Sequence, residues 1–131
     1  MQFVSIDPGK HVGIALCNNL NIFCDIRTLC GVTSDDTLEE LCEYIEARIR
    51  FLDYIVVEAF KMVSFHGQNL EAIEQIGVIK LISRVNNVPY VLQQPSVRKP
   101  FEFRVGFCST PHEKSAIAHG LYFLNKMKVK V

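Results

Sequence analysis

The first thirty residues alternate between short apolar runs and polar breaks. Residues 2–6 are mostly apolar and precede Asp-Pro-Gly, which predicts a strand that ends in a turn. Residues 11–17 and 21–29 have the composition of two further strands, and the Asn18-Asn19 pair between them is typical of a hairpin turn. The pattern therefore predicts three consecutive antiparallel strands.

A helical period follows these strands. Apolar side chains recur every three or four residues, at Leu38, Leu41, Cys42, Ile45 and Ile49. This helix is expected to begin near Ser34, with Ser34 or Asp36 as its cap, and to end before Asp53. The continuous apolar run of residues 54–57 is typical of a strand covered on both faces, and it ends at Glu58.

The remaining pattern predicts two more helices and one short strand. Residues 69–85 are expected to form a helix whose buried stripe consists of Leu70, Ile73, Ile76, Gly77, Leu81 and Ile82. Residues 89–93 are expected to form a strand, and residues 94–111 an irregular segment. Residues 112–126 are expected to form a last helix, which begins directly after Pro111. The order βββαβαβα predicts an α/β fold with a mixed five-stranded sheet flanked by helices, in a single domain over residues 1–131.

Composition narrows the functional classes only slightly. The chain has 131 residues, 49% of them hydrophobic, which suits one core. Fourteen basic and fourteen acidic residues cancel, and this balance argues against a strong non-specific DNA binder. The five cysteines form no CxxC pair and are best explained as buried side chains in a reducing compartment. Neither a signal peptide nor a membrane span is expected, so the predicted location is the cytoplasm.

Two carboxylates close two of the predicted buried strands. Asp7 follows the first strand and Glu58 ends the fourth, so both emerge at one edge of the sheet if these strands are parallel neighbours. Adjacent carboxylates repel each other unless a cation lies between them, and their hard oxygen ligands suit Mg²⁺ or Mn²⁺. The start of the last helix would add His112, Glu113 or Ser115, and metals held there can activate water against a phosphodiester.

Several ordered motifs resemble those of the RuvC-type Holliday-junction resolvases, especially their phage-like branch. Each motif is weak alone, but their order over nearly the whole chain is fairly specific. They are Val4-Ser5-Ile6-Asp7-Pro8-Gly9 followed by Val12-Gly13-Ile14-Ala15, then Ile55-Val56-Val57-Glu58, Gln75-Ile76-Gly77-Val78-Ile79-Lys80-Leu81, Pro95-Ser96-Val97-Arg98-Lys99, His112-Glu113-Lys114-Ser115-Ala116 and His119-Gly120-Leu121-Tyr122.

The resemblance implies a ribonuclease H-like fold and a homodimer that binds four-way DNA junctions and cuts two strands symmetrically, in a bacterial or phage-infected cell. It implies that Asp7 and Glu58 are metal ligands and that His112 stands where members carry an acidic or histidine ligand. Ser115 departs from the family, which has Asp directly before Ala116. Serine is a poor metal ligand, so the second metal position is left open. Glu113 is a candidate substitute, although it faces elsewhere on the helix.

Four residues are candidates for DNA contacts. Phe60 and Phe65, in the loop after Glu58, would either stack on an unpaired base at a junction or cover the core. Arg98 and Lys99 would either contact phosphate or form an ordinary surface pair. His119 is expected to be packed or solvent-facing.

Three functional hypotheses remain open. The first is a metal-dependent, structure-selective DNA endonuclease, in which Asp7 and Glu58 hold Mg²⁺ or Mn²⁺, His112 is a ligand or a proton-handling group, and Glu113 assists. The second is a junction-binding protein that has lost its chemistry through Ser115. The third is another ribonuclease H-like nuclease that acts on RNA or on flaps. Metal-dependent cleavage of competing substrates separates the three.

Overall fold

The fold is built around one mixed sheet. The computed structural model describes residues 1–59, 70–106 and 108–129. Its five strands are β1 (Phe3–Asp7), β2 (Val12–Cys17), β3 (Phe23–Leu29), β4 (Tyr54–Glu58) and β5 (Tyr90–Gln93), and they lie in the order β3-β2-β1-β4-β5. The first three strands pair antiparallel, whereas β4 pairs parallel with both β1 and β5. The predicted mixed five-stranded α/β sheet is confirmed.

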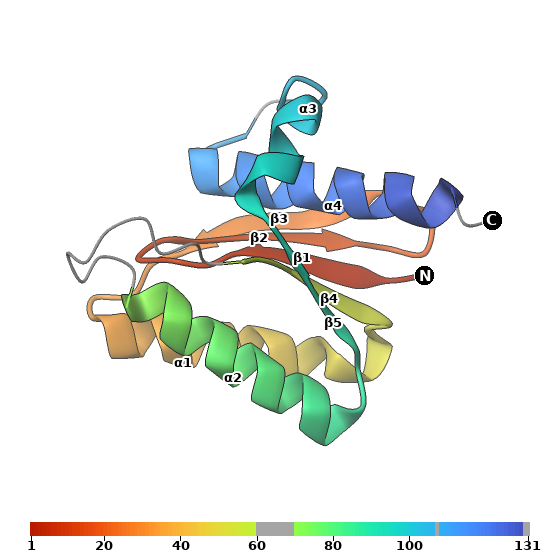
Figure 1. The fold of residues 1–131 in the computed structure, drawn as a ribbon. Coiled ribbons are helices and arrows are strands. Elements are labelled where there is room, and N and C mark those ends of the chain that lie inside the picture. Colours follow the sequence, from red (N-terminus) through yellow and green to blue (C-terminus); the bar gives the residue numbers. More distant parts are fainter. Residues whose placement is uncertain (60–69, 107, 130–131) are drawn as a thin grey trace.

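Helices cover both faces of this sheet (Figure 1). On one face lie α1 (Ser34–Arg48) and α2 (Leu70–Asn86), and on the other lies α4 (Pro111–Val129), with the short α3 (Lys99–Glu102) beside it. Two 3₁₀ turns, η1 (Ile49–Phe51) and η2 (Pro95–Arg98), complete the described elements. None of the helices in the described ranges combines the length and the apolar character needed to cross a bilayer.

Two sequence predictions about helix ends are corrected by the structure. The segment 94–111, predicted to be irregular, contains the two short helical elements η2 and α3. Each has a proline in its first turn, which favours the start of a helix. The cap of α1 is Thr33, not Ser34 or Asp36. The Thr33 hydroxyl accepts a hydrogen bond from the Asp36 backbone N–H, and the Asp36 carboxylate accepts one from the Thr33 backbone N–H.

The central strands are buried on both faces. In β1 and β4, alternate side chains pack toward α1 and α2, namely Val4, Ile6, Ile55 and Val57. The intervening Phe3 and Val56 pack against Phe123 and Leu124 of α4. Neither strand therefore has a solvent-facing side, and the first polar side chains free of the core are those at the strand ends.

The predicted buried stripe of α2 is wrong for most of its members. Leu70, Ile73 and Leu81 are 59%, 44% and 63% exposed. Ile82 is buried as predicted, and the other residues that α2 buries are Ala72, Gln75, Ile79 and Ser83. The helix carries apolar side chains on two faces, so periodicity did not identify the inner one. The buried Gln75 amide identifies it in the structure, because it hydrogen-bonds to the backbone of Gly9.

Candidate active site

The carboxyl ends of β1 and β4 bring Asp7 and Glu58 together. The parallel register pairs Ile6 with Val57, so the next residue of each strand is a carboxylic acid at the same edge of the sheet. Their side chains are only 15% and 12% exposed. The two acids lie at one edge of the sheet, as the strand ends predicted, and the structure shows in addition that both are largely buried.

The two carboxyl groups are electrostatically unequal. Burial and the neighbouring charge of Glu58 raise the pKa of Asp7 to about 7, although Ser115 and Arg98 act in the opposite direction. Burial also raises the pKa of Glu58, but His119, Arg98 and Ser115 more than offset it and lower that pKa to about 2. Near neutral pH, Glu58 is ionised while Asp7 is poised between its two forms.

Glu58 is surrounded by donors from the chain itself. The Arg98 Nη1 atom donates to Oε1 and Oε2 of Glu58 at 3.0 and 2.9 Å. The Ser115 hydroxyl donates to Oε2 at 2.9 Å, and His119 Nε2 lies 3.0 Å from the same oxygen. Arg98 Nη1 also donates to the Ser115 hydroxyl at 3.1 Å. These contacts fix the orientation of the Glu58 carboxylate.

The contact of His119 with Glu58 is a feature of the candidate site that sequence reasoning missed. The His119 side chain is fully buried, and its Nδ1 lies 2.8 Å from Oε1 of Gln93, the last residue of β5. Two signals in the sequence could have found this pair. His119 follows Ser115 by four residues, so both lie on one face of α4, and Gln93 ends β5 as Glu58 ends the neighbouring β4.

His112 lies at the first turn of α4, facing Asp7. Its Nδ1 is 4.0 Å from Asp7 Oδ2, and its ring stacks on His11 with centroids 5.3 Å apart. Burial and the nearby His11 lower the pKa of His112. The imidazole is therefore mostly neutral near pH 7, which is the form that binds a metal or accepts a proton.

Close packing of α4 on the sheet sets the position of His112. A Cβ added at Gly13 of β2 would overlap the backbone carbonyl of His112. Only a glycine at this position therefore allows α4 to pack so close to the strand. One turn further along, the buried Ser5 hydroxyl of β1 donates to the carbonyl of Ala116 at 2.6 Å. Glycine and serine at these strand positions thus fix the start of α4 above the carboxylates.

The turn after Asp7 is held from the opposite face. Gly9 has a φ of +152°, which L residues rarely adopt. Its N–H donates to Oε1 of Gln75 at 2.9 Å, and Nε2 of Gln75 donates back to the Gly9 carbonyl at 2.9 Å. Because Gln75 is buried in α2, the Asp7-Pro8-Gly9 turn is anchored to the helical layer behind it.

Solved structures that superpose on nearly the whole chain include junction resolvases. Thermus thermophilus RuvC in complex with a Holliday junction superposes with a TM-score of 0.81 at 14% identity, covering 98% of this chain and 96% of that one. The fowlpox virus Holliday junction resolvase gives 0.62 at 16% identity, covering 98% and 99%. Its complex with junction DNA gives 0.64 at 12% identity, covering 97% and 99%. The fold is that of a RuvC-type resolvase. No protein-family model matches the sequence, and no curated protein does.

In this RuvC-type fold, the remaining predicted residues lie in different places. Glu113 is turned away from the acids, since its oxygens accept hydrogen bonds from the Thr28 hydroxyl and the Ser109 backbone N–H at 2.9 and 3.1 Å. Lys99 is exposed at the start of α3. Phe60 and Phe65 lie outside the described residues. Their predicted roles stay predictions.

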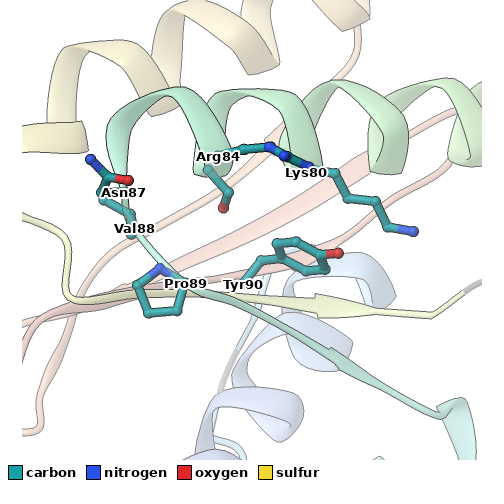
Figure 2. Close-up of a pocket in the computed structure, with 7 residues that line it drawn as sticks. Lys80, Arg84, Asn87, Val88, Pro89 and Tyr90 are labelled. Carbon is teal, nitrogen blue, oxygen red and sulfur yellow. The ribbon is translucent and has the colours of Figure 1, made fainter.

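The hollow beside Asp7 is open, and its lining contains three basic side chains and the acid Glu102. It has a volume of about 590 Å³ and is lined by residues that include Asp7, His112, Lys10, Arg98 and Lys114. A larger hollow of about 740 Å³ lies at the other end of the RuvC-type sheet, between the last turns of α2 and the start of β5 (Figure 2). Lys80, Arg84 and Tyr90 line it, but no acid or histidine does, so it lacks the groups for hydrolysis.

A divalent cation fits the chemistry of the carboxylate pair. Within the described ranges, no three Asp, Glu, His or Cys side chains converge as a ready cluster. Asp7 nevertheless has two candidate ligands as neighbours: Glu58, whose charge helps to raise the pKa of Asp7, and His112, whose Nδ1 lies 4.0 Å from Asp7 Oδ2. The repulsion that raises the pKa of Asp7 is the interaction that a cation between the oxygens would relieve.

Proposed function

We propose that this chain is a metal-dependent, structure-selective DNA endonuclease that resolves four-way junctions. The observation that carries the proposal is the pair Asp7 and Glu58, side by side at the ends of parallel strands, with His112 at the start of α4 above them. This pair lies in a RuvC-type fold, and Asp7 lines a hollow that Lys10, Arg98 and Lys114 also line. Carboxylates with a neighbouring imidazole are suitable ligands for Mg²⁺ or Mn²⁺.

The proposed roles follow from the charge state of each group. Asp7, Glu58 and His112 would hold the cation, which when bound supplies an activated water and stabilises charge on the leaving oxygen. Asp7 loses its proton readily near neutral pH because its pKa is about 7. His112 is either a ligand through Nδ1, the atom that faces Asp7, or a neutral proton acceptor. Glu58 stays ionised throughout.

Basic side chains around the hollow support binding of DNA phosphates despite the neutral net charge. Lys10, Arg98 and Lys114 border the carboxylates, and Lys99 is exposed on the neighbouring α3. A phosphodiester brought to the acids would meet these cations first. Phosphate contacts require positive charge at the right place more than an overall surplus. Branched DNA is the proposed substrate because structures with this fold include RuvC and a fowlpox virus resolvase bound to Holliday junctions.

We further propose a homodimer that forms through α2. Leu70, Ile73, Leu81 and Val85 are exposed and recur at helical spacing along one face. Gly77 lies in the same line, and no described atom is within 4 Å of a Cβ added there. A second copy of this helix, packed across the glycine, would bury these side chains by a symmetric contact. Two active sites would then be available for the two cuts of a junction.

One observation favours a second candidate, a junction-binding protein without cleavage. Ser115 supplies a hydroxyl instead of a carboxylate, and Arg98 already neutralises Glu58. Cleavage of a labelled four-way junction in Mg²⁺ or Mn²⁺ tests the two candidates. Paired symmetric cuts that disappear in Asp7→Asn support the endonuclease. Junction binding without cuts supports the second candidate. Preferential cleavage of flaps or of RNA in competition would instead favour another ribonuclease H-like nuclease.

A further inference from the structure

The Glu58 carboxylate is nearly saturated by the protein itself. A carboxylate offers about four lone-pair positions. Oε2 of Glu58 receives three contacts, from Arg98, Ser115 and His119, at 2.9, 2.9 and 3.0 Å. Oε1 receives one, from Arg98 at 3.0 Å. Only Oε1 therefore retains room for a cation, and the side of the carboxylate that carries Oε2 is closed.

Arg98 holds a fixed positive charge on this closed side. Besides Glu58, its Nη1 contacts the Ser115 hydroxyl, and its Nε lies 3.1 Å from Oε1 of Glu102 in an ion pair one helical turn away. The guanidinium is thus held between two acids and a hydroxyl. A divalent cation that approached Oε2 would have to displace it, and it would find the neutral oxygen of Ser115 as its other partner.

Asp7 is the acid of the pair that lines the open hollow, and Arg98 and Ser115 line the same hollow beside it. Asp7 faces the hollow of about 590 Å³, with the His112 imidazole as its neighbour at 4.0 Å. No cationic side chain is within salt-bridge distance of Asp7 in the described part of the chain, apart from His112 if it is protonated. Asp7, with the neighbouring His112, is therefore the acid of the pair that a cation can approach without displacing Arg98.

We propose that this site binds a single divalent cation. The Arg98 guanidinium occupies the position of a second cation and supplies the positive charge that the second cation would carry. The inference rests on the proposed nuclease function, because it concerns the same carboxylates. It assigns Arg98 to the active centre as a permanent counter-charge of Glu58. The Ser115 hydroxyl then accepts a hydrogen bond that holds Arg98 in this position. Serine is a poor metal ligand, which is consistent with that role.

Counting Mn²⁺ bound by the full chain tests this inference without reference to activity. Room-temperature EPR measures free Mn²⁺ during a titration and so gives the number bound per chain. We expect one for the wild-type protein and one for Arg104→Ala, a matched control in which an exposed arginine near the site is removed. We expect none for Asp7→Asn at the same concentrations. Circular dichroism verifies that each variant is folded.

Two further variants separate the contributions of Arg98 and Ser115. We expect Ser115→Asp alone to bind one Mn²⁺, because Arg98 still occupies the second place. We expect the double variant Arg98→Ala with Ser115→Asp to bind two. Two ions on the wild-type chain or on Ser115→Asp, or one on the double variant, would overturn the inference.

Junction cleavage measured on the same preparations distinguishes failure of the inference from failure of the proposed function. Two bound Mn²⁺ with symmetric cleavage would refute the single cation but leave the nuclease intact. One bound Mn²⁺ without cleavage would refute the nuclease but leave the single cation intact. A wild-type chain that binds no Mn²⁺ would refute both.

Discussion

The Nε2 atom of His119 lies 3.0 Å from Oε2 of Glu58, inside a protein layer that water does not reach. Its other ring nitrogen faces Oε1 of Gln93, and the amide Nε2 of Gln93 has no partner among the described residues. If the Gln93 amide is rotated by 180°, its NH₂ group donates to Nδ1 of His119 and the imidazole ring is neutral. In either orientation of the amide, the Nε2–H group of His119 donates to Glu58. His119 therefore orients the Glu58 carboxylate from the buried side.

Removal of His119 should impair catalysis more than binding. We expect His119→Ala to lower the single-turnover rate of junction cleavage by roughly 10- to 100-fold, as loss of a residue that orients a metal ligand commonly does. The affinity for the junction should change little, because the residue is buried behind Glu58. His119→Gln, which can still donate a hydrogen bond, should recover part of the rate. A wild-type rate in His119→Ala would contradict the orienting role.

Gly13 should be intolerant of even one methyl group. An added Cβ would overlap the backbone of His112, so Gly13→Ala must displace the start of α4. We expect a loss of about 1–3 kcal/mol in the free energy of unfolding, the usual cost of overpacking, and a larger proportional loss of cleavage. Urea denaturation and cleavage assays measure the two effects. Gly106→Ala is the matched control, because no described atom is within 4 Å of its added Cβ; equal effects in both variants would be inconsistent with this reasoning.

Stability of the metal-free protein should fall as the pH rises toward and through 7. The pKa of Asp7 is raised to about 7 in the folded chain, against 3.8 for an ordinary Asp. The unfolded chain therefore binds fewer protons than the folded one between these values, and folding is penalised increasingly as the pH rises. We expect a decrease on the order of 3 kcal/mol between about pH 5 and about pH 8. Urea denaturation in EDTA measures it.

Two controls accompany this pH profile. Asp7→Asn should flatten it, because an amide has no proton to lose, whereas an unchanged slope would assign the effect to other groups. Ionised Glu58 stabilises the folded chain, whereas ionised Asp7 destabilises it, since the pKa of Glu58 is lowered to about 2. Its contribution to stability is present above the ordinary pKa of 4.5 and is lost only as the pH falls toward 2, outside the measured window.

Sequence patterns located the pair of acids because their position depends on where two strands end. Asp7 and Glu58 were identifiable because each ends a strand that is mostly apolar, and parallel pairing then brings them together. His112 followed from the start of the last helix. Their roles as ligands stay predictions, to be tested by metal binding and cleavage.

The sequence did not predict contacts that depend on how a helix is rotated. Glu113 and Ser115 are two positions apart on α4, and only the packing of that helix directs Ser115 to Glu58 and Glu113 to Thr28. His119 looked like an ordinary helix residue because its partner Gln93 is 26 positions away. The same limitation affected α2, where apolar residues on two faces made the buried stripe ambiguous.

The exposed face of α2 should control the oligomeric state. We expect the wild-type chain to sediment as a dimer, and Leu81→Glu or Ile73→Glu to shift it to a monomer, because a charge would be buried against the partner copy. Leu20→Glu is the control, since Leu20 is 76% exposed and lies in the turn between β2 and β3. Analytical ultracentrifugation measures each state. A wild-type monomer, or a dimer unaffected by both α2 substitutions, would exclude this interface.

The central claim is that Asp7 and Glu58 form the centre of a junction-cutting nuclease. The most direct test is cleavage of a labelled four-way junction by the wild-type chain in Mg²⁺ or Mn²⁺, with Asp7→Asn and Ser115→Asp alongside. The account predicts symmetric cuts by the wild-type chain and a loss of cutting in Asp7→Asn. Junction binding without any cut, or cuts that persist in Asp7→Asn, would contradict it.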